Sequence, residues 1–255
     1  MGSIRILMLG GTGEARNLAQ ALDDRGHCLL LSLAGRTENP AAQPVPTRIG
    51  GFGGAEGLAN FLREHAFDLL IDATHPFAAR ISRNAEEACS KLGIVALSLR
   101  RPQWIEQAGD RWTHVETAAQ AITRLGTTPR RVFLAIGRQE AHVAEAAPQH
   151  FYLVRSVDPV DPPLRLPDMR CLLDRGPFDM ERESTLLESN GIDVVVAKNS
   201  GGAATYGKIE AARRLGLDVI MIARAPATAM RTVTTVGAAL DAIDHLFLPE
   251  MKRGV

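Results

Sequence analysis

The sequence predicts an α/β protein made of two doubly wound, Rossmann-like domains, each built on a parallel sheet. Short apolar runs alternate with helix-length segments almost throughout the 255 residues. The apolar runs, such as Leu69-Leu70-Ile71, are continuous, as is typical of parallel strands covered on both faces. Residues 100–104 interrupt the alternation, and a second series follows. We therefore expect two domains, residues 1–103 and 104–255, with a ligand cleft between them.

In the first series, each apolar run reads as a strand and each amphipathic segment as a crossover helix. The helix after the first strand, for example, carries apolar residues at Ala15, Leu18, Ala19 and Leu22, a helical spacing. Strands are expected at residues 4–9, 28–33, 47–49, 68–72 and 94–98, and helices at residues 14–24, 56–65 and 77–92.

The second series repeats the same alternation after the interruption. A proline-rich stretch at residues 158–167 indicates a loop. Strands are expected at residues 131–136, 151–155, 193–197 and 219–222, and helices at residues 117–125, 180–190, 205–215 and 237–246.

Charge and cysteine content exclude several classes of function. Lys plus Arg and Asp plus Glu both total 29, so the chain lacks the basic surface needed for broad nucleic-acid binding. No apolar run is long enough to span a bilayer, and the chain starts with a strand instead of a signal sequence. The three cysteines are far apart, which predicts neither disulfides nor a metal site and fits the cytoplasm.

A glycine-rich turn follows the first strand and consists of Gly10, Gly11, Thr12, Gly13 and Glu14. In this position, glycines let the backbone approach a pyrophosphate, and the next helix offers free N–H groups and a positive dipole end. The match to G-x-G-x-x-G/A is imperfect, because Arg16 stands where a small residue is expected. The run predicts a nucleotide site, with an ordinary strand–helix turn as the alternative.

Residues after two further strands of the first series also point to ligand binding, because parallel strands end at one edge of the sheet. Arg36 follows the second strand, where NAD-binding proteins carry an acidic residue, and an arginine there suits the 2′-phosphate of NADP. A solvated loop arginine is the alternative. Thr74 could cap the helix that follows, and this would leave His75 exposed at the sheet edge.

The second series places cations and hydrogen-bonding groups at its strand ends. Lys198, Asn199, Ser200, Gly201 and Gly202 follow one apolar strand in a further glycine-rich turn. A structural turn explains the two glycines equally well. Arg138, Arg155 and Ser156 also lie at strand ends. Several cationic strand ends around one cleft would recognise a polyanionic ligand.

With these residues assembled, the chain resembles the precorrin-6A reductase family of corrin biosynthesis over nearly its whole length. The Thr-His-Pro-Phe-Ala and Lys-Asn-Ser-Gly-Gly segments together make the resemblance specific. The shared segments are residues 10–14, 72–78, 135–138, 155–159, 176–178, 198–202, 208–212 and 220–226, with Thr205.

The resemblance implies an NADPH-dependent reduction of one ring-D double bond of precorrin-6A, a polycarboxylate tetrapyrrole, to the dihydro product precorrin-6B. The first domain would hold NADPH, and the product would pass to neighbouring pathway enzymes. Lys198 is the candidate for electrostatic help or proton supply. The cofactor residues would be Gly10, Gly11, Thr12, Gly13, Glu14, Arg36 and Thr74, and the substrate residues His75, Phe77, Arg138, Arg155, Ser156, Lys198, Asn199, Ser200, Gly201 and Gly202.

Three alternatives stay open at this point. The substrate could carry cobalt, as in the anaerobic route, or the chain could bind NADP(H) without catalysis. A short-chain oxidoreductase would use a Tyr-x-x-x-Lys pair. Neither Tyr152 nor Tyr206 is followed by lysine at that spacing, which argues against this class.

Overall fold

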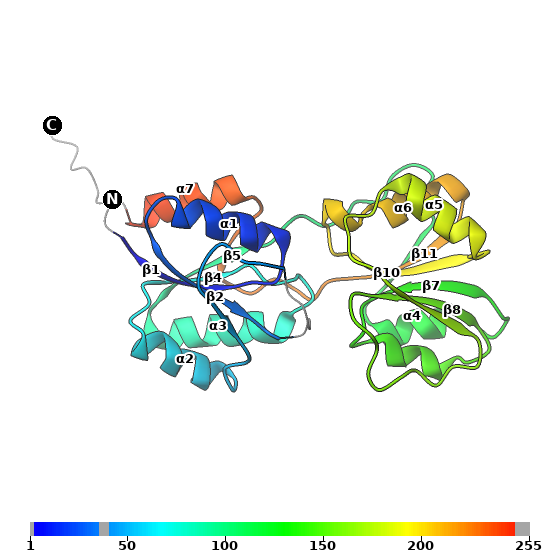
Figure 1. The fold of residues 1–255 in the computed structure, drawn as a ribbon, viewed down its shortest axis with the longest axis horizontal. Helices are drawn as coiled ribbons and strands as arrows, with labels where there is room; N and C mark the ends of the chain where they lie inside the picture. Colours follow the sequence, from blue (N-terminus) through cyan, green and yellow to red (C-terminus); the bar gives the residue numbers. More distant parts are fainter. Residues whose placement is uncertain (1–2, 36–40, 248–255) are drawn as a thin grey trace. The chain divides into compact units, whose positions relative to one another are not determined.

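The chain forms two compact units, each built on a six-stranded parallel sheet (Figure 1). The computed structural model describes residues 3–35 and 41–247. One unit runs from the N-terminus to Pro102 and resumes at Pro226, and the other comprises Gln103–Ala225. The first boundary lies close to the expected one. The expected assignment of 104–255 to one domain is wrong, because the segment from Pro226 belongs to the first unit.

The first sheet has the strand order of dinucleotide-binding folds, with its sixth strand supplied by the returning chain. The order is β12-β5-β4-β1-β2-β3. The sequence did not predict β12, which is only three residues long and has no apolar run of its own; it pairs with β5 through Arg231 and Leu97. The strands are β1 (Arg5–Leu9), β2 (Cys28–Leu33), β3 (Thr47–Ile49), β4 (Leu69–Asp72), β5 (Val95–Leu99) and β12 (Arg231–Val233).

Helices cover both faces of this sheet, as expected for a doubly wound unit (Figure 1). On one face, α1 (Gly13–Asp23) lies beside α7 (Val236–Phe247), and on the other α2 (Ala55–Glu64) lies beside α3 (Ala79–Leu92). Leu18 of α1 and Ile243 of α7 belong to one apolar core cluster. The chain therefore returns from the second unit to complete the sheet and to cover this face.

The second sheet repeats the strand order, but here the outermost position is filled by the strand that comes first in the chain. The order is β6-β11-β10-β7-β8-β9, all parallel. Strands β6 and β9 were not predicted: β6 has no apolar run, and in β9 the apolar residues are interrupted by Arg170 and are exposed or half-buried. The strands are β6 (Trp112–Val115), β7 (Arg131–Ala135), β8 (Phe151–Ser156), β9 (Met169–Leu173), β10 (Val194–Lys198) and β11 (Asp218–Ile222).

Helices α5 (Met180–Ser189) and α6 (Gly207–Leu215) cover one face of this sheet, and α4 (Ala118–Arg124) covers the other with the 3-10 helix η1 (Ala141–Ala146) (Figure 1). Helix α6 starts later than predicted, because residues Ala203–Thr205 form the separate 3-10 turn η2. Among the described residues, no helix is long and apolar enough to cross a membrane.

The buried His150 makes stability depend on pH. It is 1% exposed, its Nδ1 accepts a hydrogen bond from Arg130 N, and burial lowers its pKa below 6.5. The unfolded chain therefore binds a proton at a higher pH than the native protein, so the free energy of unfolding falls as pH drops below about 6.5. Burial also lowers the pKa of His27, which contributes a decline of the same sign. We expect denaturant titrations at pH 7.5, 6.5 and 5.5 to show the decline, and His150→Gln to make it smaller. An equal pH slope in both proteins would exclude His150 as the source.

Candidate functional site

The glycine turn after β1 lies at the carboxyl edge of the first sheet, between the ends of β1 and β4. Thr12 caps α1, because its Oγ1 accepts from Ala15 N at 3.1 Å, and the same hydroxyl donates to Ala73 O at 2.9 Å. Thr12 thus ties the two neighbouring strand ends together. This is the topological switch point at which open α/β sheets bind ligands.

Gly11 is the residue of this turn whose backbone conformation favours glycine. Its φ of +117° lies in the region that L side chains rarely adopt, and no protein atom lies within 4 Å of a Cβ placed there. The backbone at Gly11 is therefore open, and a ligand can approach it closely. The adjacent N-terminus of α1, with its positive dipole end, suits an anionic phosphate.

A pocket opens beside this turn, lined by Thr12, Glu14, Thr74, Pro76, Leu99 and Arg101. Glu14 forms an ion pair with Arg101, with 2.9 Å between Oε2 and Nη1. The negative charge of Glu14 alone would repel a phosphate, but the guanidinium of Arg101 balances it. The sequence did not single out Arg101. Arg101 lies two residues after the end of β5, at the same sheet edge, and this position was the available signal.

Thr74 does not cap the following helix, contrary to expectation. Its N–H and Oγ1 both donate to Asp72 Oδ1, at 3.1 and 2.7 Å, in a turn local to the end of β4. Helix α3 starts at Ala79 without a side-chain cap. His75 is exposed, as expected, and its Nδ1 accepts from Phe77 N at 3.3 Å. Both residues therefore remain at the sheet edge beside the pocket.

The predicted 2′-phosphate residue, Arg36, lies outside the described residues. A second arginine that the sequence did not single out, Arg48, lies at the same edge. Its Nη1 donates to Ser32 Oγ at 2.8 Å and to Gly50 O at 3.0 Å, and its guanidinium lies over Phe52. Burial lowers the pKa of Arg48. These contacts give Arg48 a structural role in fixing the chain after β3.

The corresponding switch point of the second sheet lies between β7 and β10, and Lys198 ends β10 there. Its Nζ lies 2.8 Å from Oε2 of Glu140. The side chain of Lys198 is 16% exposed and that of Glu140 is 44% exposed. The sequence did not predict Glu140, because a polyanionic ligand is recognised by cations. The position of Glu140 in the loop after β7 was the available signal.

Arg138 lies in the same loop and also faces acidic and carbonyl oxygens. Its Nη2 is 4.0 Å from Asp158 Oδ2, and its Nη1 donates to Pro159 O at 3.4 Å. Ser156 is buried and donates from Oγ to Asp158 O at 2.7 Å. Ser156 thus shapes the loop after β8, and Arg138 presents a cation beside it.

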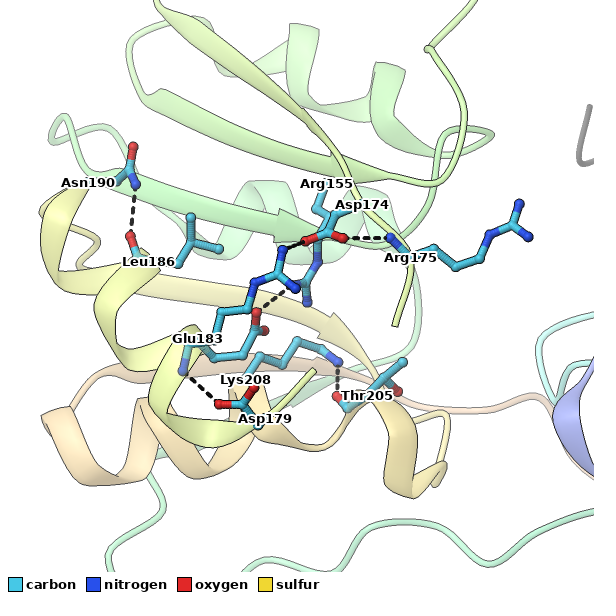
Figure 2. Close-up of polar contacts among 10 residues, drawn as sticks. Arg155, Asp174, Arg175, Asp179, Glu183, Leu186, Asn190, Thr205 and Lys208 are labelled. Atoms are coloured by element: carbon cyan, nitrogen blue, oxygen red, sulfur yellow. Dashed lines mark hydrogen bonds and ion pairs between the residues drawn. The ribbon is translucent and has the colours of Figure 1, made fainter. Parts of the chain in front are cut away.

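Arg155 was predicted to contact the substrate, but it is buried inside the second unit, where its guanidinium points toward Glu183 (Figure 2). Its Nη1 contacts Glu183 Oε1 at 2.5 Å, and its guanidinium carbon lies 3.7 Å from the ring centre of Phe178. The side chains of Arg155 and Glu183 are 6% and 2% exposed. We therefore assign Arg155 to the packing of β8 against α5 and not to the substrate.

Asn199 is likewise engaged within the protein. Its side chain accepts from Trp104 N at 2.8 Å and donates to Trp104 O at 3.0 Å, and its carbonyl accepts from Arg224 Nε. Asn199 thus holds both segments through which the chain enters and leaves the second unit. The next residue, Ser200, is buried against Thr205, so these two predicted substrate residues have structural contacts.

Gly201 and Gly202 complete the turn after β10. Gly201 has φ +70°, which requires glycine, and Gly202 precedes the 3-10 turn η2. The structural explanation of these glycines is therefore sufficient. At the carboxyl edges of the two sheets, the structure places the Gly10–Glu14 turn, Thr74, His75, Phe77 and Arg101 in the first unit and Arg138, Glu140 and Lys198 in the second.

Comparison with known proteins decides the family. The family model for precorrin-6x reductase CbiJ/CobK matches residues 5–244. The chain belongs to this family. Precorrin-6A reductases from a Sinorhizobium species and from Rhodobacter capsulatus are 56% and 52% identical to it; the matches cover 96% and 90% of this chain and 94% and 91% of those proteins.

A solved structure, CobK precorrin-6A reductase, has the same fold as this precorrin-6x reductase family member. The TM-score is 0.91 at 48% identity, and the match covers 99% of this chain and 100% of that chain. A cobalt-precorrin-6A reductase from Priestia megaterium is more distant, at 30% identity over 86% of this chain and 90% of that protein. Membership of a reductase family makes the protein an oxidoreductase, and it implies a nicotinamide cofactor.

Proposed function

We propose that the protein is a precorrin-6A reductase that uses NADPH to saturate one ring-D double bond and form precorrin-6B. The observation that carries the proposal is its 56% identity to a precorrin-6A reductase over nearly the whole chain. The open glycine turn at the switch point of the first sheet supports it independently. The three cysteines are free thiols, which fits a protein of the cytoplasm.

NADPH binds, in this proposal, at the carboxyl edge of the first sheet. Gly11 lets the backbone approach the pyrophosphate, and the N-terminus of α1 directs N–H groups and a positive dipole end toward it. Arg101 offsets the charge of Glu14 beside the pocket. When bound, the nicotinamide supplies the hydride, and the protein contributes binding and orientation.

The substrate carries several carboxylates, and cations are needed to bind them. Arg138 and Lys198, at the switch point of the second sheet, and His75, at the edge of the first, are the side chains we assign to this task. Phe77 offers an apolar surface to the macrocycle. Lys198 is also our candidate for supplying the proton that must accompany the hydride.

The decisive experiment mixes the purified protein with NADPH and precorrin-6A and follows both absorbances together. We expect NADPH to be consumed in step with the change in the macrocycle spectrum. If NADPH binds and neither spectrum changes, the proposal is wrong for this substrate. Repeating the assay with the cobalt complex then separates a cobalt-precorrin-6A reductase from a protein that only binds NADP(H).

Arg36 gives a separate prediction on cofactor choice. Replacing it with glutamine should remove most of the preference for NADPH over NADH, because an arginine after the second strand pairs with the 2′-phosphate. The ratio of kcat/KM for the two cofactors measures this. Arg25→Gln is the matched control. Arg25 lies in the turn between α1 and β2, at the opposite edge of the sheet, and pairs with Asp244 of α7. An unchanged ratio in Arg36→Gln would exclude the assignment.

A further inference from the structure

Lys198 and Glu140 are brought together by the neighbouring strands β10 and β7 at the switch point of the second sheet. Glu140 lies in the loop between β7 and η1, and its side chain is almost three times as exposed as that of Lys198. The Glu140 carboxylate can return to water at small cost, because it is already half solvated. The more buried ammonium of Lys198 gains more from an anion close to it.

Two other cations of this edge differ in the exposure of their acidic partners. Asp158, near Arg138, is 11% exposed, and Glu183, paired with Arg155, is 2% exposed. Glu140, at 44%, is the most exposed of these three partners. A carboxylate from outside can replace Glu140 much more readily than it can replace Glu183, whose displacement would require the packing of α5 to open.

We propose that, in the unliganded protein, Glu140 occupies the position on Lys198 that a substrate carboxylate takes on binding. This inference rests on the proposed function. Before binding, the Glu140 carboxylate occupies Lys198 Nζ. On binding, a carboxylate of the macrocycle takes that position, and Glu140 turns into solvent, with no covalent step. Glu140 is thus a specificity-determining residue, because a ligand that lacks a carboxylate at this point cannot replace the ion pair between Glu140 and Lys198.

If this exchange occurs, removing the acidic residue Glu140 should make precorrin-6A bind more tightly. We expect Glu140→Gln to lower the Kd of precorrin-6A about two- to fivefold, the worth of an exposed ion pair. The Kd is measured by titrating the macrocycle absorbance without NADPH. Glu181→Gln is the matched control, because Glu181 forms an exposed pair with Arg214 at the same 2.8 Å and carries the same charge.

A second variant shows whether the effect acts through Lys198. In a Lys198→Met background, Glu140→Gln should no longer lower the Kd, because there is no ammonium group for which Glu140 and the substrate carboxylate compete. An unchanged or higher Kd in Glu140→Gln alone, or an equal decrease in Glu181→Gln, would overturn the exchange. If the wild-type protein binds precorrin-6A without oxidising NADPH, only the proposed function is overturned. The Kd values then still test whether a substrate carboxylate replaces Glu140 on Lys198. Wild-type protein that does not bind precorrin-6A overturns both.

Discussion

Glu183→Leu is expected to lower the free energy of unfolding by about 3–5 kcal/mol, the cost of leaving a buried charge without its partner. The Arg155 guanidinium contacts Glu183 (Figure 2). It also lies over the rings of Phe178 and Phe133. Water cannot reach it in place of the lost carboxylate without opening the contact between β8 and α5. Urea unfolding followed by circular dichroism measures the change.

Two further variants test the reason for this loss. Glu181→Leu, on the same helix, breaks an exposed pair and should cost less than about 1 kcal/mol. Arg155→Met combined with Glu183→Leu should regain most of the stability, because no buried charge remains. Glu183 Oε2 has no hydrogen-bond partner among the described residues, so the native pair is itself incompletely satisfied. Equal losses in Glu183→Leu and Glu181→Leu would contradict this interpretation.

Lys198→Met should raise the Kd of precorrin-6A about 10- to 100-fold, the range expected for losing a charge-assisted hydrogen bond of about 1.5–3 kcal/mol. Titration of the macrocycle absorbance gives the Kd, and steady-state kinetics at saturating substrate gives kcat. Lys198 lies at the end of β10, and its low exposure makes its interaction with an anion stronger than that of a surface lysine.

The division between kcat and KM then decides the role of Lys198 in the chemistry. A higher KM with unchanged kcat would leave it a binding residue only, and a lower kcat as well would support proton supply. Lys91→Met is the control, because Lys91 is an exposed lysine in the last turn of α3. A Kd that changes equally in both variants would remove Lys198 from the site.

The buried strands were predicted accurately because their signal is local. Strands such as β4 and β10 are covered by helices on both faces, so they need continuous apolar runs that are visible in the sequence. The outer strands β6 and β12 carry no such run, and that of β9 is limited to its last three residues. Their positions depend on pairing with a neighbour that is distant in the chain, as for β12 with β5.

The glycine turns were also visible in advance, although their individual roles were not. A turn between a strand and a helix favours glycine where φ is positive, as at Gly11 and Gly201. The pattern is the same whether the turn faces a ligand or the protein. In the structure, the turn at Gly11 is open, whereas Asn199 and Ser200 of the other turn contact the protein's own chain.

By itself, the sequence determined the α/β class, the two parallel sheets and the position of the glycine turn after the first strand, because apolar runs and glycines act within a few residues. Only the tertiary structure decided which cations are available to a ligand. Arg155 and Lys198 look alike in the sequence, because both lie at strand ends. In the structure, Arg155 pairs with the buried Glu183 of α5, and Lys198 pairs with the exposed Glu140 of a loop. A charge is neutralised by its nearest partner in space, and that partner can lie anywhere in the chain.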